Sequence, residues 1–218
     1  MDLERFKPHC RPMPWTVKTE WQWPKGDKKL VLVFDHVADI DGFMQYVDKR
    51  EVCIQAGGAC GVWPYRFAQL FENVYTFEPQ PENFACLMAN CDLPNITAFN
   101  APLSNDREKY TISNDIHERE NFGAGYAVRN AAGLEAMMID DLKLDACDLI
   151  QLDIEGFERN ALLGGSETIA RHRPVIVLEE KPLNHLPLSQ GQKAREWLQA
   201  EFGYKQVDKI HWDVILTC

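Results

Sequence analysis

Short apolar stretches alternate with amphipathic ones along most of the chain, and this alternation predicts the secondary structure. Residues that recur at helical spacing, three and four positions apart, predict helices at 38–48, from Pro64, from Pro81, at 157–163, from Ser166 and at 190–202. Runs of β-branched, aromatic and other apolar residues predict strands at 30–34, 52–56, 73–77, 95–99, 149–153, 175–178, 204–207 and 214–217. Residues 104–133 are less regular, and extended pieces are predicted only at 109–112 and, just after, at 134–139.

The order of these elements indicates the fold class. Strands that alternate with helices predict an open α/β fold, with a mostly parallel sheet covered by helices on both faces. The last two strands are joined by a short turn near His211–Asp213, which predicts an antiparallel final pair. Ligands of such sheets bind at the carboxyl ends of the strands. Chemistry is therefore expected just after Ala56, Phe77, Phe99, Asp153 and Leu178.

The first 29 residues differ from the rest, because prolines alternate with Trp15, Trp21 and Trp23. Proline fixes φ and lacks an N–H donor, which excludes a long helix or an inner strand. Two interpretations stay open: an extended arm whose tryptophans pack on the main body, or a lid over a substrate cleft. We therefore expect an N-terminal arm at 1–29 and one domain at 30–218.

Composition and charge narrow the classes of protein. Of 218 residues, 45% are hydrophobic and 26% charged, which suits one globular domain. No apolar run is long enough for a membrane helix, and residues 1–14 lack the apolar core of a signal peptide. A net charge of −10 argues against a general nucleic-acid binder. Seven cysteines without a CxxC pair argue against zinc-finger and thioredoxin folds and predict reduced thiols in a cytoplasmic protein.

Two features at neighbouring strand ends indicate a nucleoside site. Gly57, Gly58 and Gly61 follow the strand at 52–56, and glycines let the backbone approach a ligand. Their spacing is neither the dinucleotide fingerprint nor a Walker loop. Glu78 ends the next strand and can accept hydrogen bonds from both hydroxyls of a ribose. The alternative for Glu78 is a carboxylate stabilised by the dipole of the helix from Pro81.

A third strand end carries the acidic sequence Asp153-Ile154-Glu155-Gly156-Phe157-Glu158. It is either ordinary negative charge at a helix N-terminus, or a cluster that faces a cationic ligand or accepts a proton from a substrate hydroxyl. Histidines are weaker candidates. His185 is the best histidine base, whereas the acidic residues around His36 are interpreted as a polar segment leading into a helix.

Four segments, VCIQAGGACG, TFEPQPENFACLMANC, LIQLDIEGFERNALLGG and VIVLEE, occur in this order within residues 50–180. Together they resemble the FkbM-like methyltransferase family. The resemblance implies a Rossmann-like class I methyltransferase fold, an α/β fold with a mostly parallel seven-stranded sheet and an antiparallel C-terminal strand. It also implies S-adenosyl-L-methionine as cofactor and O-methylation of a sugar or another small molecule, so that the partner is a small-molecule or carbohydrate acceptor.

The resemblance also implies a role for individual residues. Glu78 would hold the ribose, and Asp153 would lie near the methionine amine or the sulfonium. The family usually has an aspartate at the position of Gln55, whose amide can still accept from the cofactor ammonium without the charge attraction. The other implied positions are Gly57, Gly58 and Gly61 around the methionine, Asn100, Ala101 and Pro102 beside the adenine, and Glu155, Glu158 and Glu179 near the acceptor.

Methyl transfer requires aligned reactants and, for a hydroxyl acceptor, a base; Asp153 and Glu155 are the candidates, with Glu179 beside them. A metal-assisted version with Asp153 and Glu179 as oxygen ligands is not favoured, because no third ligand is evident, and no metal is expected. Two other functions stay open. One is a module that binds the cofactor without turnover, which is considered because Gln55 replaces the aspartate usual in the family. The other is a nicotinamide-dependent oxidoreductase, which the missing fingerprint disfavours.

Overall fold

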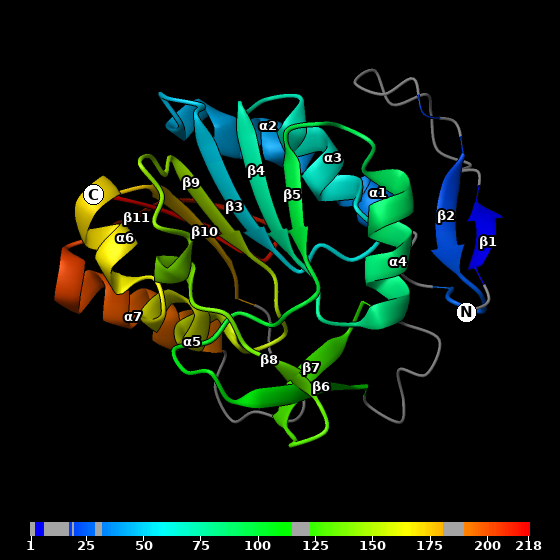
Figure 1. The fold of residues 1–218 in the computed structure, drawn as a ribbon. Coiled ribbons are helices and arrows are strands. Elements are labelled where there is room, and N and C mark those ends of the chain that lie inside the picture. The colour runs from blue at the N-terminus through cyan, green and yellow to red at the C-terminus, as the bar shows by residue number, and fades with distance from the viewer. Residues whose placement is uncertain (1–2, 7–17, 19, 29–31, 115–122, 181–189) are drawn as a thin grey trace.

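A seven-stranded sheet forms the centre of the computed structural model, which describes residues 3–6, 18, 20–28, 32–114, 123–180 and 190–218 (Figure 1). The strand order is β11-β12-β10-β9-β3-β4-β5. Strands β10, β9, β3, β4 and β5 are parallel, and the final strand β12 is antiparallel to both of its neighbours. The mostly parallel sheet with an antiparallel C-terminal strand is therefore confirmed. The strands are β3 Val52–Ala56, β4 Asn73–Phe77, β5 Ile96–Phe99, β9 Leu149–Leu152, β10 Val175–Glu179, β11 Lys205–Ile210 and β12 Asp213–Thr217.

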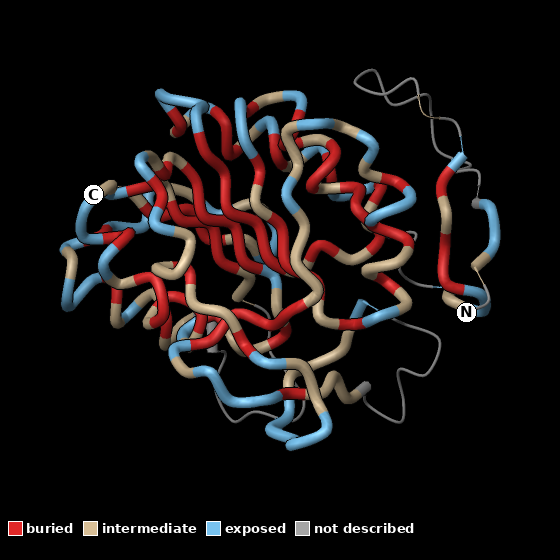
Figure 2. Tube along the Cα trace, viewed as in Figure 1, coloured by how far each residue is buried: buried red, intermediate tan, exposed pale blue. Residues whose placement is uncertain are grey.

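Helices cover both faces of the sheet, and a separate apolar core lies under each layer (Figures 1 and 2). Successive residues of a strand point to opposite faces, so Cys53 packs in one core and Ile54 in the other. The first layer comprises α1 Val33–His36, α2 Asp39–Phe43, the 3₁₀ turn η2 Met44–Tyr46, α3 Val62–Ala68 and α4 Pro81–Asn90. The second comprises α5 Glu158–Leu163, α6 Ser166–His172 and α7 Gln190–Phe202.

The strand predicted at 30–34 is wrong for the residues that the structure describes. Val33 begins the short helix α1, and residues 30 and 31 lie outside the described part of the chain. The buried residues of this segment are Phe34, Val37 and Ile40, which recur at intervals of three. That spacing places them on one face of consecutive helical turns, so packing of a helical face overrides the β-branched run.

The N-terminal arm packs on the main body through two of its tryptophans. Strand β1 Leu3–Phe6 pairs antiparallel with β2 Trp21–Pro24. Trp21 and Trp23 are 0% and 1% exposed, and both rings contact Phe34. This confirms the packing interpretation for these two residues, whereas Trp15 lies outside the described residues. Figure 1 shows β1 and β2 beside α4, on the outer side of that helix.

A small antiparallel sheet is inserted between β5 and β9, and it lies beyond one end of the main sheet (Figure 1). It confirms the extended pieces at 109–112 and at the start of 134–139, although residue 139 already begins the 3₁₀ turn η3 Ile139–Leu142. Tyr110 packs edge-on against Phe157, with ring centroids 5.1 Å apart. This contact fixes the insertion over the loop after β9. The strands are β6 Lys109–Asn114, β7 Gly125–Arg129 and β8 Leu134–Glu135.

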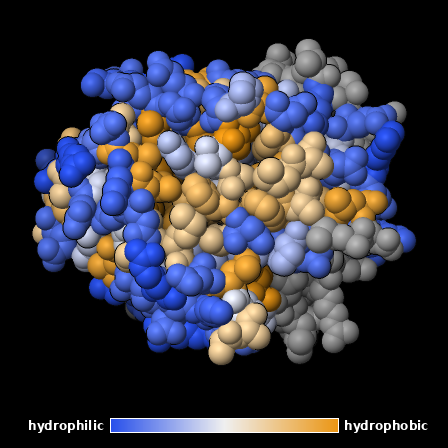
Figure 3. All heavy atoms as spheres, in the orientation of Figure 1, coloured by the Kyte–Doolittle hydropathy of each residue, from blue (hydrophilic) through white to orange (hydrophobic). Residues whose placement is uncertain are grey.

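The surface carries both hydrophobic and hydrophilic residues, and the described cysteines are reduced, as the sequence predicts. On the face shown in Figure 3, hydrophobic residues reach the surface in the middle and hydrophilic residues surround them. The six cysteines within the described residues are free thiols, and four of them are buried. A search of the described residues found no helix with the length and apolar character needed to cross a membrane.

Candidate active site

A cavity of about 300 Å³ lies at the carboxyl ends of the central strands. The chain moves outward from β3 through β4 to β5, then returns to place β9 on the other side of β3. Loops diverge at this switch point, which leaves room for a ligand. Ile112 and Ala127 of the small sheet also line the cavity, so the insertion forms part of its wall. The volume is at the lower end of the range for small-molecule sites.

The glycine turn after β3 brings the backbone close to the acidic loop after β9. Gly57 lines the cavity at a φ of +85°, and a Cβ at this position would overlap the backbone carbonyl oxygen of Asp153. A Cβ on Gly58 would lie 2.6 Å from Leu87 Cδ1, and one on Gly61 would lie 2.6 Å from Cys91 Sγ. Gly58 and Gly61 therefore let the turn pack against α4, and only Gly57 of the three lines the cavity.

Glu78 is held at the end of β4 with its carboxylate against the glycine turn. It is 6% exposed, and it accepts hydrogen bonds from the N–H groups of Ala59, at 2.7 Å, and Gln80, at 2.8 Å. Burial raises the pKa of Glu78 to about 7, against the opposing effect of these two donors. Because Glu78 also lines the cavity, its carboxylate is placed to accept further donors from a ligand.

The three residues predicted to flank an adenine follow β5 and differ in position. Ala101 and Pro102 line the cavity. Asn100 instead donates a hydrogen bond from Nδ2 to the backbone carbonyl of Glu78, at 2.8 Å. Asn100 therefore supports the strand end that carries Glu78.

Two glutamines lie side by side on the floor of the cavity. Gln55 and Gln151 are register partners on β3 and β9, and each is 1% exposed. Gln55 Oε1 accepts a hydrogen bond from Thr76 Oγ1 at 2.6 Å. Gln151 Oε1 is buried and has no hydrogen-bond partner among the described residues. Buried polar atoms in folded proteins are nearly always paired, so Gln151 presents an acceptor for a ligand.

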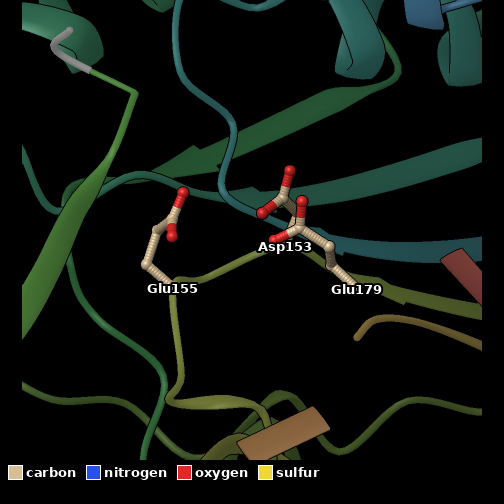
Figure 4. A group of neighbouring side chains, drawn as sticks. All are labelled: Asp153, Glu155 and Glu179. Carbon is tan, nitrogen blue, oxygen red and sulfur yellow. The ribbon is translucent and has the colours of Figure 1, made fainter. Parts of the chain in front are cut away.

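Three carboxylates converge at one side of the cavity. Asp153 follows β9, Glu155 lies two residues later in the same loop, and Glu179 ends β10. One oxygen of each lies within 4.8 Å of one oxygen of the other two. Figure 4 shows the carboxylates of Asp153 and Glu179 next to each other, with that of Glu155 across from them. The structure therefore brings together all three residues predicted to be catalytic.

Glu158, the last acidic residue of the loop, has a different position. It is 2% exposed, and its Oε1 accepts hydrogen bonds from the N–H groups of Ile154 and Gly156. These bonds brace the loop at Glu155, which has a φ of +53°. Glu158 does not belong to the described lining of the cavity. Glu158 therefore supports the loop through its backbone bonds, and its expected place near an acceptor stays a prediction.

A histidine and an aspartate from distant parts of the chain meet at the same cavity. His211 Nδ1 lies 2.8 Å from Asp39 Oδ2, and the rings of His211 and His36 have centroids 5.5 Å apart. All three residues line the cavity. Asp41 instead forms an ion pair with Arg66 at 2.6 Å, so the acidic residues near His36 are divided between two environments.

Comparisons with known proteins identify the family. The family model described as the methyltransferase FkbM domain matches residues 63–206, which is more than half of the chain. The chain belongs to the FkbM methyltransferase family. A search of the curated proteins found no match.

Solved structures agree with the FkbM assignment at the level of the fold. The crystal structure of an FkbM methyltransferase from Methylobacillus flagellatus is similar with a TM-score of 0.51 and 20% identity. This chain covers 43% of that protein, and 77% of this chain is covered. The protein YhhF of Escherichia coli, described as a candidate methyltransferase, gives a TM-score of 0.50 at 11% identity, over 98% of this chain and 96% of that one. The predicted Rossmann-like class I methyltransferase fold is thereby confirmed.

The FkbM family implies S-adenosylmethionine as the cofactor, and the cavity fits it. Gly57 leaves the space that a Cβ would fill. Glu78 lines the cavity with an acceptor group, which matches the donors of a ribose. The buried Oε1 of Gln80 has no hydrogen-bond partner among the described residues, and an adenine amine can supply a donor.

Sequence reasoning missed Gln151 and His211. Gln151 interrupts an apolar strand one residue before its end, as Gln55 does on the neighbouring strand. A polar residue at that point of a buried strand is the signal that could have found it. His211 could not be found, because its contact with Asp39 joins positions 172 residues apart. His185, the favoured histidine, lies outside the described residues.

Proposed function

We propose that this FkbM-family chain transfers the methyl group of S-adenosylmethionine to a hydroxyl oxygen of a sugar or another small molecule. The observation that supports this most is the placement of Glu78 and the carboxylate cluster in one cavity, on opposite sides of the glycine turn. One end suits a nucleoside, and the other suits a hydroxyl that must lose a proton. The chain spans less than half of the crystallised FkbM relative, so the activity of the whole protein is part of the proposal.

Different residues of this chain bind different parts of the cofactor. Glu78 accepts the ribose hydroxyls, while Ala101 and Pro102 contact the adenine from the β5 side. Gln55 presents its amide oxygen to the methionine ammonium in place of the charged aspartate common in the family. Bound in this way, the cofactor supplies a methyl group activated by positive sulfur.

The acidic side of the cavity orients the acceptor and removes its proton. Asp153 and Glu155 are the two candidate bases, and Glu155 is the more buried of the pair at 9% exposure. As the new O–C bond forms and the C–S bond breaks, the hydroxyl proton passes to one of these carboxylates. Asp39 orients His211 at the same mouth, where its ring can hydrogen-bond a second polar group of the acceptor.

The charge of the cavity disfavours a phosphorylated acceptor or a nucleic acid. The described lining contains neither lysine nor arginine. It contains six carboxylates, which are those of Asp39, Glu78, Asp153, Glu155, Glu179 and Asp213. Phosphates would be repelled by this surface. A neutral acceptor such as a sugar is therefore the best match, and a cytoplasmic location stays a prediction.

Calorimetric titration tests the cofactor first. We expect S-adenosylhomocysteine to bind and NAD to give no heat. Clear NAD binding without S-adenosylhomocysteine binding would instead support the oxidoreductase. Transfer of a labelled methyl group from S-adenosylmethionine to a panel of neutral sugars and hydroxylated small molecules tests the reaction. Binding of S-adenosylhomocysteine without transfer to any of them would support the module that binds the cofactor without turnover.

The Glu155→Gln variant tests the assignment of the base. We expect it to lose turnover by 10²-fold or more, on the order of a general base contribution, while S-adenosylhomocysteine binding stays normal. Asp145→Asn serves as the control, because Asp145 is an exposed carboxylate at the amino end of β9. Full turnover of Glu155→Gln with normal cofactor binding would overturn the assignment of Glu155.

A further inference from the structure

We propose that Asp153, Glu155 and Glu179 bind a divalent cation, with the amide oxygen of Gln151 facing the same site. The cation would hold two adjacent oxygens of the acceptor, which narrows the acceptor class to vicinal diols and α-hydroxy carbonyl compounds. The cation site is argued from the side chains alone, whereas its role toward an acceptor rests on the proposed function.

The geometry of the three carboxylates suits a hard cation. One oxygen of each residue lies within 4.8 Å of the others. Calcium binds oxygen at about 2.3–2.6 Å, so two ligands on opposite sides of the ion are ~4.6–5.2 Å apart. Magnesium, at about 2.0–2.1 Å, would require closure to ~4.2 Å or less. Three oxygens at the 4.8 Å limit would lie ~2.8 Å from their common centre, so small rotations of the side chains suffice for calcium and larger ones for magnesium.

Gln151 provides an observation independent of the acidic cluster. Its side chain is 1% exposed and lines the same cavity, two residues before Asp153 on β9. Its Oε1 is buried and accepts no hydrogen bond from the described residues. An amide carbonyl is a normal oxygen ligand of calcium and magnesium. A cation reached directly or through one water would satisfy this atom, and a neutral acceptor without donors on this side would not.

The described lining of the cavity is strongly acidic. Within the described lining, six carboxylates are accompanied by no lysine or arginine and by two histidines, His36 and His211. The cofactor sulfonium supplies one positive charge near the glycine turn. Glu179 and Asp213 are register neighbours on β10 and β12, which places a further carboxylate beside the cluster. A divalent ion shared by the cluster would reduce the repulsion between its neighbouring carboxylates.

The ligand set indicates which cations fit. All four candidate atoms are oxygens, which suit Mg²⁺, Mn²⁺ or Ca²⁺. The cysteines, which soft metals prefer, are absent from the described lining of the cavity. Open coordination positions toward the cavity would be taken by water or by acceptor oxygens. A cation-bound hydroxyl loses its proton more readily, and Asp153 or solvent receives that proton as the O–C bond forms and the C–S bond breaks.

Manganese is the probe for the experiment, because its electron paramagnetic resonance signal reports bound and free ion without any acceptor. We expect the full chain to bind one Mn²⁺ and to release it when Mg²⁺ or Ca²⁺ is added. Glu179→Gln should weaken Mn²⁺ binding at least 10-fold. Gln151→Leu should weaken it several-fold, and Asp145→Asn should leave it unchanged. Thermal melts of each variant verify that the protein is folded, so Glu179→Gln and Gln151→Leu provide two separate tests.

The outcomes separate this inference from the proposed function. Binding of S-adenosylhomocysteine without Mn²⁺ binding would overturn the cation site and leave the methyltransferase proposal intact. Mn²⁺ binding that survives both Glu179→Gln and Gln151→Leu would also overturn it, because the ion would then lie elsewhere. Mn²⁺ binding that is lost in the folded Glu179→Gln variant, but not in Asp145→Asn, would support the site even in a protein without methyl transfer.

Discussion

Gly57 and Asp153 meet at the switch point of the sheet, so closely that a Cβ on Gly57 would overlap the carbonyl oxygen of Asp153. The N–H of Asp153 in turn donates to the carbonyl of Ala56 at 3.1 Å, which joins the two strand ends. The turn that shapes the cofactor end of the cavity therefore also positions the first carboxylate of the acidic cluster.

The Gly57→Ala variant should lose both stability and cofactor binding. A side chain at a φ of +85° is strained, and the overlap with Asp153 forces the two loops apart. We expect a loss of about 2–4 kcal/mol in the free energy of unfolding. Denaturant melts measure this loss, and calorimetry with S-adenosylhomocysteine measures binding. Gly203→Ala is the matched control, since Gly203 has a φ of +74° but open space around its Cα. Equal losses in both variants would show that strain alone, without the contact to Asp153, explains the effect.

The sequence predicts the strands that end at the cavity better than it predicts the N-terminal part of the domain. Val52–Ala56 and Leu149–Leu152 are buried along their whole length, so their apolar runs are unambiguous. The segment around Phe34 contains the same residue types, yet only tertiary packing determines that it is helical. Local composition could not settle this, because β-branched runs also occur on the buried faces of helices.

The residues of the candidate site also differ in how well the sequence predicts their positions. Glu78, Asp153 and Glu155 could be predicted, because each follows directly from the carboxyl end of a strand. The meeting of Glu155 with Glu179 depends on the loop conformation at Glu155, whose positive φ is not visible in the sequence. This is why sequence reasoning considered only Asp153 and Glu179 as possible cation ligands.

Glu78→Gln should weaken cofactor binding in a pH-dependent way. Hydrogen bonds to a charged group are worth about 1.5–3 kcal/mol, so we expect S-adenosylhomocysteine affinity to fall ~10- to 100-fold at pH 8. Burial raises the pKa of Glu78 to about 7. The wild-type affinity should therefore increase from pH 6 to pH 8, as the carboxylate ionises and becomes the stronger acceptor.

Calorimetry at several pH values measures this difference, and the Glu78→Gln variant should lack that increase. Glu82→Gln makes the same change at a half-buried carboxylate in the first turn of α4, outside the described lining of the cavity, and should bind normally. If Glu78→Gln bound as tightly as Glu82→Gln at pH 8, Glu78 would not contact the ribose.

Asn90→Ala should release the N-terminal arm from the main body. Asn90 is 1% exposed, and its side chain bonds the N–H and carbonyl of Gln22, at 2.8 and 2.9 Å, and the carbonyl of Cys60 at 2.8 Å. Removing it leaves buried backbone groups unpaired, which should cost about 2–4 kcal/mol. We expect faster proteolysis within the arm than in Asn130→Ala, whose amide makes an exposed local turn. Unchanged proteolysis would show that the remaining contacts of the arm, including those of Trp21, Trp23 and Lys18, are enough to hold it.

Glu158→Gln should change how stability depends on pH. Burial raises the pKa of Glu158 from 4.5 to about 7 in the folded protein, against the opposing effect of bonds from Ile154 and Gly156. Between these two pH values the unfolded chain releases the proton while the folded protein keeps it. The free energy of unfolding of the wild type should therefore fall as pH rises through this window and level off above it.

The glutamine variant keeps an oxygen for both backbone donors and has no charge to bury, so this part of the fall should disappear. Its new NH₂ group replaces Oε2, a buried atom without a hydrogen-bond partner among the described residues, and that change costs a similar amount at every pH. The wild type and the variant are therefore compared by the slope of the free energy of unfolding against pH. From pH 5 to pH 8 the variant should gain on the order of 1–3 kcal/mol relative to the wild type, as measured by urea melts. Glu78, whose pKa burial also raises, is present in both proteins. Its contribution to the pH dependence of the free energy of unfolding therefore cancels in the comparison. Parallel pH profiles would mean that Glu158 ionises in the folded protein as readily as in the unfolded chain.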